Sequence, residues 1–302
     1  MQPGKGITLE SSILSSVVLP LALLIVMLGL GLSLTPEDFR RILKQPKSVC
    51  VGIVCQMLIL PCLAFLIAKA LDMPDMLAIG LMALSLSPGG VTSNMFTFLA
   101  RGNVALSITL TAIVSLLTPV TVPIVLQLVI KHFLGLDDVI EIPFIKTVLT
   151  LIGITVIPVC AGMYLKHRSS DFAAKCENTA RMISILFLFL IVVALIIKNI
   201  DNIGQFFAQA GLASLVLNVS GLMLGTVVAK LLLKNNRDAC TIGLETGIQN
   251  GTTALFITAT LLGNATMAIP PAVYSLLMFP TGALASVLFS KLILRYSSEN
   301  NN

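Results

Sequence analysis

Residues 238–262 read DACTIGLETGIQNGTTALFITATLL, and the expected architecture is organised around them. Glu245 is the one charged residue between Asp238 and Lys291. A carboxylate at the centre of a bilayer costs roughly 2.5–3.5 kcal/mol, so we expect Glu245 to face a protein interior or a watery cavity, holding a cation or a proton. The polar group at 249–253 has low helix propensity and indicates a broken transmembrane helix, whose ends expose backbone groups that can hold ions.

The composition identifies a polytopic membrane protein. Of 302 residues, 56% are hydrophobic and 11% charged, and the mean hydropathy is +0.99, whereas a soluble domain carries about 25% charged residues. The net charge of +5 lies mostly in loops, so we interpret it as an orientation signal and expect a lipid bilayer, not nucleic acid, as partner. The six cysteines and two histidines have no metal-ligand spacing, which argues against a transition-metal site or a disulfide framework.

Intervals without charge predict an all-α fold with nine transmembrane helices, since one span needs about 20 apolar residues. A basic loop at 40–47 separates the first two spans. The predicted spans are 11–36, 48–68, 76–100, 104–130, 143–165, 182–197, 206–229, 238–262 and 268–289.

The basic residues select one orientation. With the N-terminus outside and the C-terminus in the cytoplasm, five of the 19 Lys and Arg residues lie on the outer side, and the opposite orientation reverses that count. The five are Lys5, Lys69, Lys131, Lys146 and Lys198. We therefore expect a multi-pass protein of the cell membrane with its C-terminus in the cytoplasm.

An internal repeat links the third and eighth spans. The sequence DMLAIGL at 75–81 matches DACTIGL at 238–244, and Gly102-Asn103 recurs as Gly263-Asn264. Each copy contains a break, SPGG at 87–90 and Asn250-Gly251. The copies start on opposite sides of the membrane, and inverted repeats with matching breaks indicate a secondary transporter with its site at mid-depth.

The residues at the breaks suit ions. Pro88 lacks a backbone donor and the following glycines tolerate unusual dihedrals, so the helix should stop near Ser87 and restart near Val91. A restarting helix offers free amides and a positive dipole end, which suit an anion. Hard oxygen donors that suit sodium also lie here, although Gln56, Ser107 and Thr111 could equally make ordinary helix–helix hydrogen bonds. The donors are Gln56, Ser93, Asn94, Ser107, Thr111, Glu245 and Gln249.

Three motifs resemble the sodium/bile-acid symporter family: PGGVTSN at 88–94, LARGNVALS at 99–107 and ETGIQN at 245–250. The resemblance covers nearly the whole chain from Leu21 and is to the nine-span members. It implies one transmembrane transporter domain, residues 1–302, with two crossing broken helices. A core of about 47–132 and 206–293 would lie beside a panel of about 11–34 and 143–199.

The resemblance also implies roles for individual residues. The first sodium site would comprise Ser93, Asn94, Ser107, Thr111 and Glu245. The second would comprise Gln56, Glu245, Gln249 and the backbone carbonyls of Thr246 and Ile248. Substrate would bind at the restarts, at Val91, Thr92, Asn250, Gly251 and Thr252. This chain has Val91 where the family usually has Thr and Ile248 where it usually has Met, so the ion sites look kept and the substrate pocket altered.

The sequence therefore predicts a sodium-coupled symporter of organic anions, bile-acid-like or other small carboxylates, that works by alternating access. Two sodium ions would be the coupling ions, with no other cofactor. Proton coupling through Glu245 and a ligand sensor that binds without transporting are the alternatives. An intramembrane hydrolase is disfavoured, because no histidine or aspartate lies in the interior of a predicted span, Asp238 being the first residue of its span.

Overall fold

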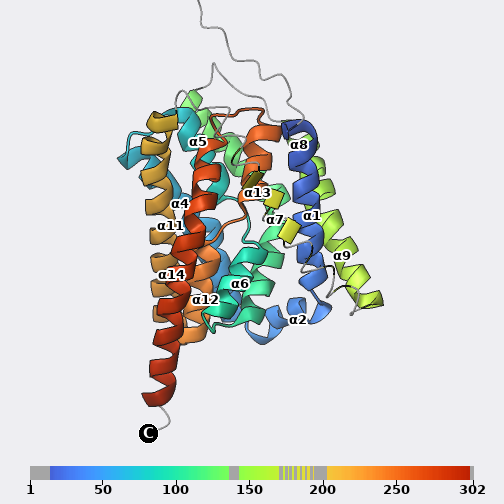
Figure 1. Cartoon of the computed structure of the whole chain (residues 1–302), viewed down its shortest axis with the longest axis vertical. Helices are drawn as coiled ribbons and strands as arrows, with labels where there is room; N and C mark the ends of the chain where they lie inside the picture. The colour runs from blue at the N-terminus through green and yellow to red at the C-terminus, as the bar shows by residue number, and fades with distance from the viewer. Residues whose placement is uncertain are drawn as a thin grey trace, which may run out of the picture.

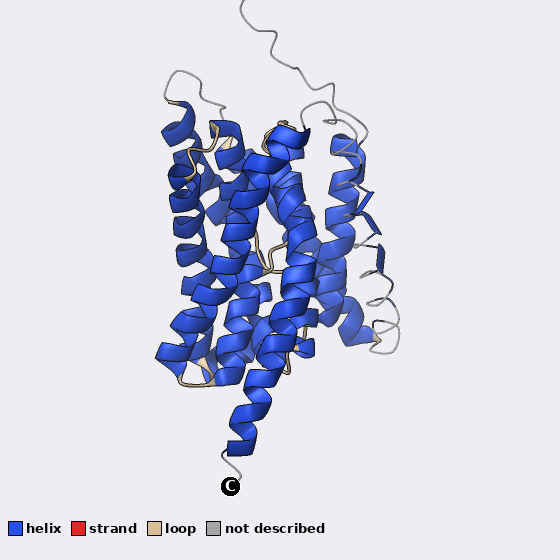
Figure 2. Ribbon diagram, turned by 60° about the vertical axis from the view of Figure 1, so that its left-hand side comes forward, coloured by secondary structure: helices blue, strands red, loops and turns tan. Residues whose placement is uncertain are grey.

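A computed structural model describes residues 14–135, 143–169 and 203–299, together with scattered positions between 173 and 193. Every regular element in this described part is helical (Figure 2). Six helical segments are long and apolar enough to cross a bilayer, as the composition predicts. They are Ser16–Ser33, Pro46–Ala70, Val104–Leu134, Phe144–Arg168, Ala210–Leu233 and Ile269–Leu294.

Two further predicted spans consist of shorter helices separated by a break, as described below. The predicted span at 182–197 lies largely outside the described residues, so the count of nine remains a prediction. The elements outside the two broken spans are η1 (Leu14–Val18), α1 (Leu19–Ser33), α2 (Pro36–Lys44), α3 (Pro46–Val54), η2 (Cys55–Ile59), α4 (Leu60–Ala70), α7 (Val104–Leu134), α8 (Phe144–Leu151), η3 (Ile152–Val156), α9 (Ile157–Arg168), α11 (Ile203–Leu233) and α14 (Ile269–Glu299).

The expected basic loop after the first span is wrong, because most of it forms α2. Thr35 precedes this helix, and its backbone amide and hydroxyl both donate to Asp38 Oδ2 at 2.8 Å. Pro36 occupies the first helical position, where its missing N–H costs nothing. Glu37 and Asp38 complement the positive helix end. The sequence TPED at 35–38 is therefore a helix-start signal.

Three of the wide, π-type turns lie just before a proline. The segments η1, η2 and η3 end two residues before Pro20, Pro61 and Pro158. Proline removes an amide donor and crowds the preceding turn, and a wider turn relieves that crowding without ending the helix. Gln56, a predicted sodium ligand, lies in the wide turn η2.

The predicted breaks are present in both copies of the repeat. In the first, α5 (Asp75–Ser85) ends before the break and α6 (Val91–Leu99) follows it. In the second, α12 (Asn236–Gly247) is followed by α13 (Gly251–Leu255), which continues into η5 (Phe256–Leu261). The breaks touch each other, since the Asn250 amide donates to the Pro88 carbonyl at 2.8 Å.

The two broken pairs run in opposite directions (Figure 1). The start of the second copy meets the turn that ends the first, where Asn103 Nδ2 donates to Asp238 Oδ1 at 2.9 Å. The turn that ends the second copy meets the start of the first, where Asn264 Nδ2 lies 3.5 Å from Met76 Sδ. These contacts show that the two broken pairs are antiparallel to each other.

Helices α1 and α9 approach closely through glycines. A Cβ added to Gly31 would lie 2.2 Å from the Val159 carbonyl oxygen, and one added to Gly162 would lie 2.4 Å from that of Leu28. Small residues allow such backbone contact between membrane helices. Lys166 Nζ also donates to the Ser33 carbonyl at 2.6 Å, so α1 and α9 form a tightly packed pair.

Candidate functional site

Glu245 lies near the end of α12, beside the crossing of the breaks, and is 1% exposed. Its carboxylate accepts hydrogen bonds from two hydroxyls of α7, Ser107 Oγ at 2.5 Å and Thr111 Oγ1 at 2.8 Å. Within the described residues no basic side chain lies within salt-bridge distance of it. A buried carboxylate with neutral partners alone is poorly compensated, so the site is suited to a cation or a proton.

Ser107 indicates where a positive charge would be held. Its hydroxyl oxygen lies 2.5 Å from Glu245 Oε1 and 2.7 Å from Asn94 Oδ1. A hydroxyl has one hydrogen, which serves one of these two acceptors. The other close pair of oxygens then lacks a hydrogen between them, and either a cation at their centre or a proton on Glu245 would stabilise this arrangement.

Gly89 closes the same group of oxygens from the first break. A Cβ added there would lie 2.6 Å from Glu245 Oε2 and 3.2 Å from both Ser93 Oγ and Thr111 Oγ1. Ser93 Oγ in turn donates to the Gly90 carbonyl at 2.7 Å. The structure thus brings together all five residues predicted for the first sodium site.

The residues predicted for the second site share a different feature. Both side-chain polar atoms of Gln56 and the amide oxygen of Gln249 are buried, and they have no hydrogen-bond partner among the described residues. Such orphaned polar atoms are costly and rare. Gln249 Nε2 donates to the carbonyls of Glu245 and Thr246 at 3.1 and 2.9 Å, and η2, which carries Gln56, packs against α12. These amide oxygens are suitable ligands for a hard cation.

Two residues that the sequence analysis did not select hold the end of α12. Asn218 Nδ2 of α11 and the Tyr274 hydroxyl of α14 each donate to the Gly247 carbonyl at 2.7 Å, and both residues are fully buried. Gly247 lies between Thr246 and Ile248, whose carbonyls are the predicted ligands. A lone buried Asn and Tyr at long sequence distance give no local signal, so sequence reasoning missed them.

The predicted substrate residues lie at the two restarts. Val91 and Thr92 are half-buried in the first turn of α6. Asn250 caps α13 by accepting from the Thr253 amide at 3.1 Å, with Gly251 and Thr252 buried in the first turn. The first amides of a helix have no partner inside it, so these positions offer donors to an anion.

A second polar group fastens the far end of α12. Asp238 accepts from Ser48 Oγ at 2.8 Å and from Asn103 Nδ2 at 2.9 Å. Asn103 also caps α7 through the Leu106 amide at 3.1 Å, and its own amide donates to Thr241 Oγ1 at 2.8 Å. This group is fully paired and therefore has the character of a structural fastening.

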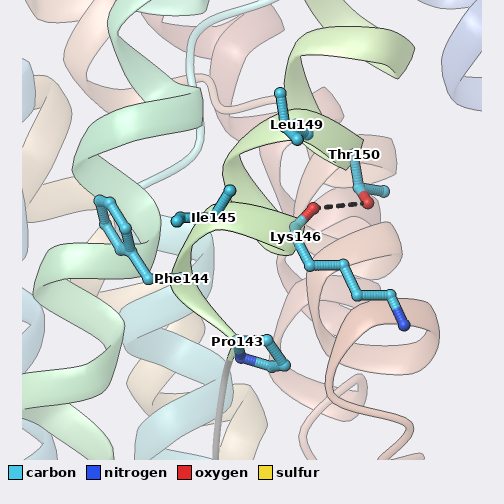
Figure 3. A pocket seen from close by; sticks show the side chains of 6 residues that line it. All are labelled: Pro143, Phe144, Ile145, Lys146, Leu149 and Thr150. Carbon is cyan, nitrogen blue, oxygen red and sulfur yellow. Dashed lines mark hydrogen bonds between the residues drawn. The ribbon is translucent and has the colours of Figure 1, made fainter.

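A surface cavity of about 830 Å³ lies at the start of α8 (Figure 3). Thr150 Oγ1 donates to the Lys146 carbonyl there at 2.8 Å, within the same helix. The cavity is lined by Pro143, Phe144, Ile145, Lys146, Leu149 and Thr150. None of them belongs to either break, so this cavity is not the candidate substrate site.

Comparison with known proteins gives a consistent answer. A model of the sodium bile acid symporter family matches residues 20–206. An uncharacterized sodium-dependent transporter of Bacillus subtilis is 31% identical over 268 residues, covering 88% of this chain and 81% of the relative. A hepatic sodium/bile acid cotransporter of Rattus norvegicus is 30% identical over 252 residues, covering 83% and 69%.

A probable chloroplastic sodium/metabolite cotransporter of Arabidopsis thaliana is 29% identical over 253 residues. The match covers 84% of this chain and 62% of the relative, so this chain spans less than two thirds of that protein. The names of these relatives describe sodium-dependent transport with more than one class of substrate.

Proposed function

Because the chain belongs to the sodium bile acid symporter family, we propose that it is a sodium-coupled symporter of small organic anions. It would work by alternating access in the cell membrane, and as a transporter it would carry out no chemical conversion. Its N-terminus would lie outside and its C-terminus in the cytoplasm. The core of about 47–132 and 206–293 would move against a panel of about 11–34 and 143–199, and the tight packing of α1 on α9 supports a panel that moves as a unit.

One observation carries the proposal. The Glu245 carboxylate lies among the side-chain oxygens of Ser107, Thr111, Asn94 and Ser93. The single hydroxyl hydrogen of Ser107 cannot serve both of its close oxygen neighbours, Glu245 Oε1 and Asn94 Oδ1. Sodium prefers hard oxygen ligands and would compensate the carboxylate. The orphaned amide oxygens of Gln56 and Gln249 support a second sodium ion nearby.

The helix restarts support an anionic substrate. Helix α6 and the α13–η5 segment begin at the crossing from opposite directions, so a carboxylate there would meet two positive helix ends. Val91 and Thr92 are partly exposed, which supports access to this point. Bile-acid-like molecules and other small carboxylates both fit this requirement.

The charges give a direction to transport. Two sodium ions contribute +2, and Glu245 with a substrate carboxylate contributes −2, so the loaded site would be neutral and less costly to enclose. If Glu245 stays with the protein, each cycle moves a net charge of +1. An inside-negative potential would then drive uptake by about 2.3 kcal/mol per 100 mV.

The test is uptake of a panel of labelled organic anions by proteoliposomes, with and without a sodium gradient and an imposed potential. We expect sodium- and potential-dependent uptake by the wild type and none by Glu245→Gln. Asp75→Asn is the matched control, because Asp75 is the exposed acidic residue that starts the other repeat. Uptake that follows a pH gradient and ignores sodium would establish proton coupling instead, and sodium-dependent binding without flux would establish a sensor.

A further inference from the structure

Arg101 lies in the motif LARGNVALS at 99–107, and the transport site does not account for its side chain. Ser107 contacts Glu245, and Asn103 caps α7 and fastens Asp238. A Cβ added to Gly102 would lie 2.7 Å from Thr241 Oγ1, so close packing accounts for that glycine. Arg101 is exposed, and within the described residues its side chain makes no hydrogen bond or salt bridge.

Arg101 shares a cavity of about 520 Å³ with Arg237, from the first turn of α12. The remaining lining residues are Phe98, Leu99, Gly102 and Val104, and none of them is acidic. The described part of the chain contains no carboxylate within salt-bridge distance of either arginine. Asp238 adjoins Arg237 in sequence, but its oxygens accept from Ser48 and Asn103 instead. Two guanidinium groups beside one cavity repel each other unless an anion lies between them.

Helix lengths place this cavity at the level of lipid headgroups. Helix α6 has 9 residues and α12 has 12. Both helices lie between the central crossing and the same end of the molecule, in the lower half of Figure 1. At 1.5 Å per residue they reach about 13 and 18 Å from mid-depth. The hydrocarbon core extends about 15 Å on each side of its centre. Arg101 and Arg237 therefore lie near the boundary between acyl chains and headgroups.

The cavity also has an apolar lining. Phe98 is 71% and Leu99 53% exposed, and both precede Arg101 by no more than one turn of α6. An occupant should thus carry a negative group for the arginines and an apolar portion for these side chains. We propose that the Arg101–Arg237 cavity binds the phosphate of an anionic phospholipid, with its acyl chains along Phe98 and Leu99. With the orientation proposed above, this lipid belongs to the cytoplasmic leaflet, where anionic lipids meet basic residues.

The backbone at Arg101 allows a test of the side chain alone. Arg101 has φ of 58°, in the left-handed region that favours glycine. Its amide donates to the Phe98 carbonyl at 3.0 Å, and Asp72 and Lys234 adopt the same conformation where α4 and α11 end. The conformation therefore belongs to the end of a helix, and glycine can replace arginine there without strain.

The experiment titrates purified protein with short-chain phosphatidylglycerol, short-chain phosphatidylcholine or inorganic phosphate, with native mass spectrometry and the thermal midpoint as readouts. We expect phosphatidylglycerol to bind and stabilise the wild type, with about tenfold weaker binding after Arg101→Gln or Arg237→Gln, since each removes charge-assisted hydrogen bonds. Arg40→Gln is the matched control, because Arg40 is an exposed arginine already paired with Glu37 at 3.5 Å.

Arg101→Gly separates binding from folding. Glycine suits the left-handed backbone, so this variant should be at least as stable as the wild type without lipid and yet lose the response to phosphatidylglycerol. Equal binding of phosphatidylglycerol by the wild type and the Arg101→Gln/Arg237→Gln variant would overturn the proposal. Equal stabilisation by inorganic phosphate would show a site for a free anion and would overturn the lipid as occupant. Either result is independent of sodium coupling.

Discussion

Gly89 is the residue at which the first break touches the carboxylate of the second copy. A methyl group there would lie 2.6 Å from Glu245 Oε2, so either the break or the carboxylate must shift. Overpacking of this kind costs about 1–3 kcal/mol. We expect Gly89→Ala to raise the sodium concentration for half-maximal uptake at least tenfold.

The matched control for this prediction is Gly153→Ala, since nothing lies within 4 Å of a Cβ at Gly153. Alanine is favoured over glycine inside a helix by about 1 kcal/mol, so the control should be neutral or slightly stabilising. An unchanged sodium dependence in Gly89→Ala would show that the oxygens around Glu245 are not the ion site.

Tyr274 supplies a second prediction at this scale. Tyr274→Phe removes one of the two donors to the Gly247 carbonyl and leaves Asn218 as the other. Loss of a buried hydrogen bond costs about 0.5–1.5 kcal/mol, which should appear as a lower thermal midpoint and weaker sodium-induced stabilisation. Asn218→Ala should lower the thermal midpoint and the sodium-induced stabilisation in the same way. The loss in the double variant should differ from the sum of the two single losses, because both side chains donate to the same carbonyl oxygen.

Ser275→Ala is the control for Tyr274→Phe, because Ser275 is buried on the same helix and donates within it to the Pro271 carbonyl. Its removal should leave the sodium response unchanged. An equal loss of sodium-induced stabilisation in Ser275→Ala would show that the effect of Tyr274→Phe comes from the packing of α14 and not from the bond to Gly247.

Among the elements, α12 is fastened at its start and the corresponding helix α5 is not. Asp238 is buried and accepts from Ser48 and Asn103, whereas Asp75 at the start of α5 is exposed. We expect Asp238→Ala to lower the free energy of unfolding by about 2–4 kcal/mol, since it leaves the buried donor of Ser48 and the half-buried donor of Asn103 unpaired. Asp75→Ala should change it by no more than about 0.5 kcal/mol. Thermal unfolding in detergent compares them, and equal effects would contradict the asymmetry.

The elements also show what a sequence can and cannot predict. Pro88 with two glycines, and Asn250 with Gly251, predict their own breaks because local backbone chemistry determines them. The clustering of Ser107 and Thr111 with Glu245 follows from helical spacing and from the family resemblance. The bond from Asn250 to Pro88, and the contacts of Asn218 and Tyr274 with Gly247, depend on packing between distant segments. No local pattern records such packing, so the sequence did not predict them.

At the scale of the whole molecule, the antiparallel repeat makes a prediction about sidedness. The starts of the two copies lie at opposite ends of the molecule, since each meets the closing turn of the other. In a background without the six native cysteines, Asp75→Cys should react with an impermeant maleimide in intact cells. Arg237→Cys should react only after the membrane is opened. Labelling of both from one side would contradict the inverted arrangement, and the reverse pattern would contradict the orientation alone.

The hydrogen bond that joins the two breaks involves backbone atoms alone, the Asn250 amide and the Pro88 carbonyl. No replacement of a neighbouring side chain removes either atom. Val91, Thr92 and Thr252 can therefore vary over evolutionary time without loosening the scaffold that carries the ion ligands. Proteins with this crossing can therefore change their substrate while they keep the same coupling ion, which makes the architecture well suited to diversification.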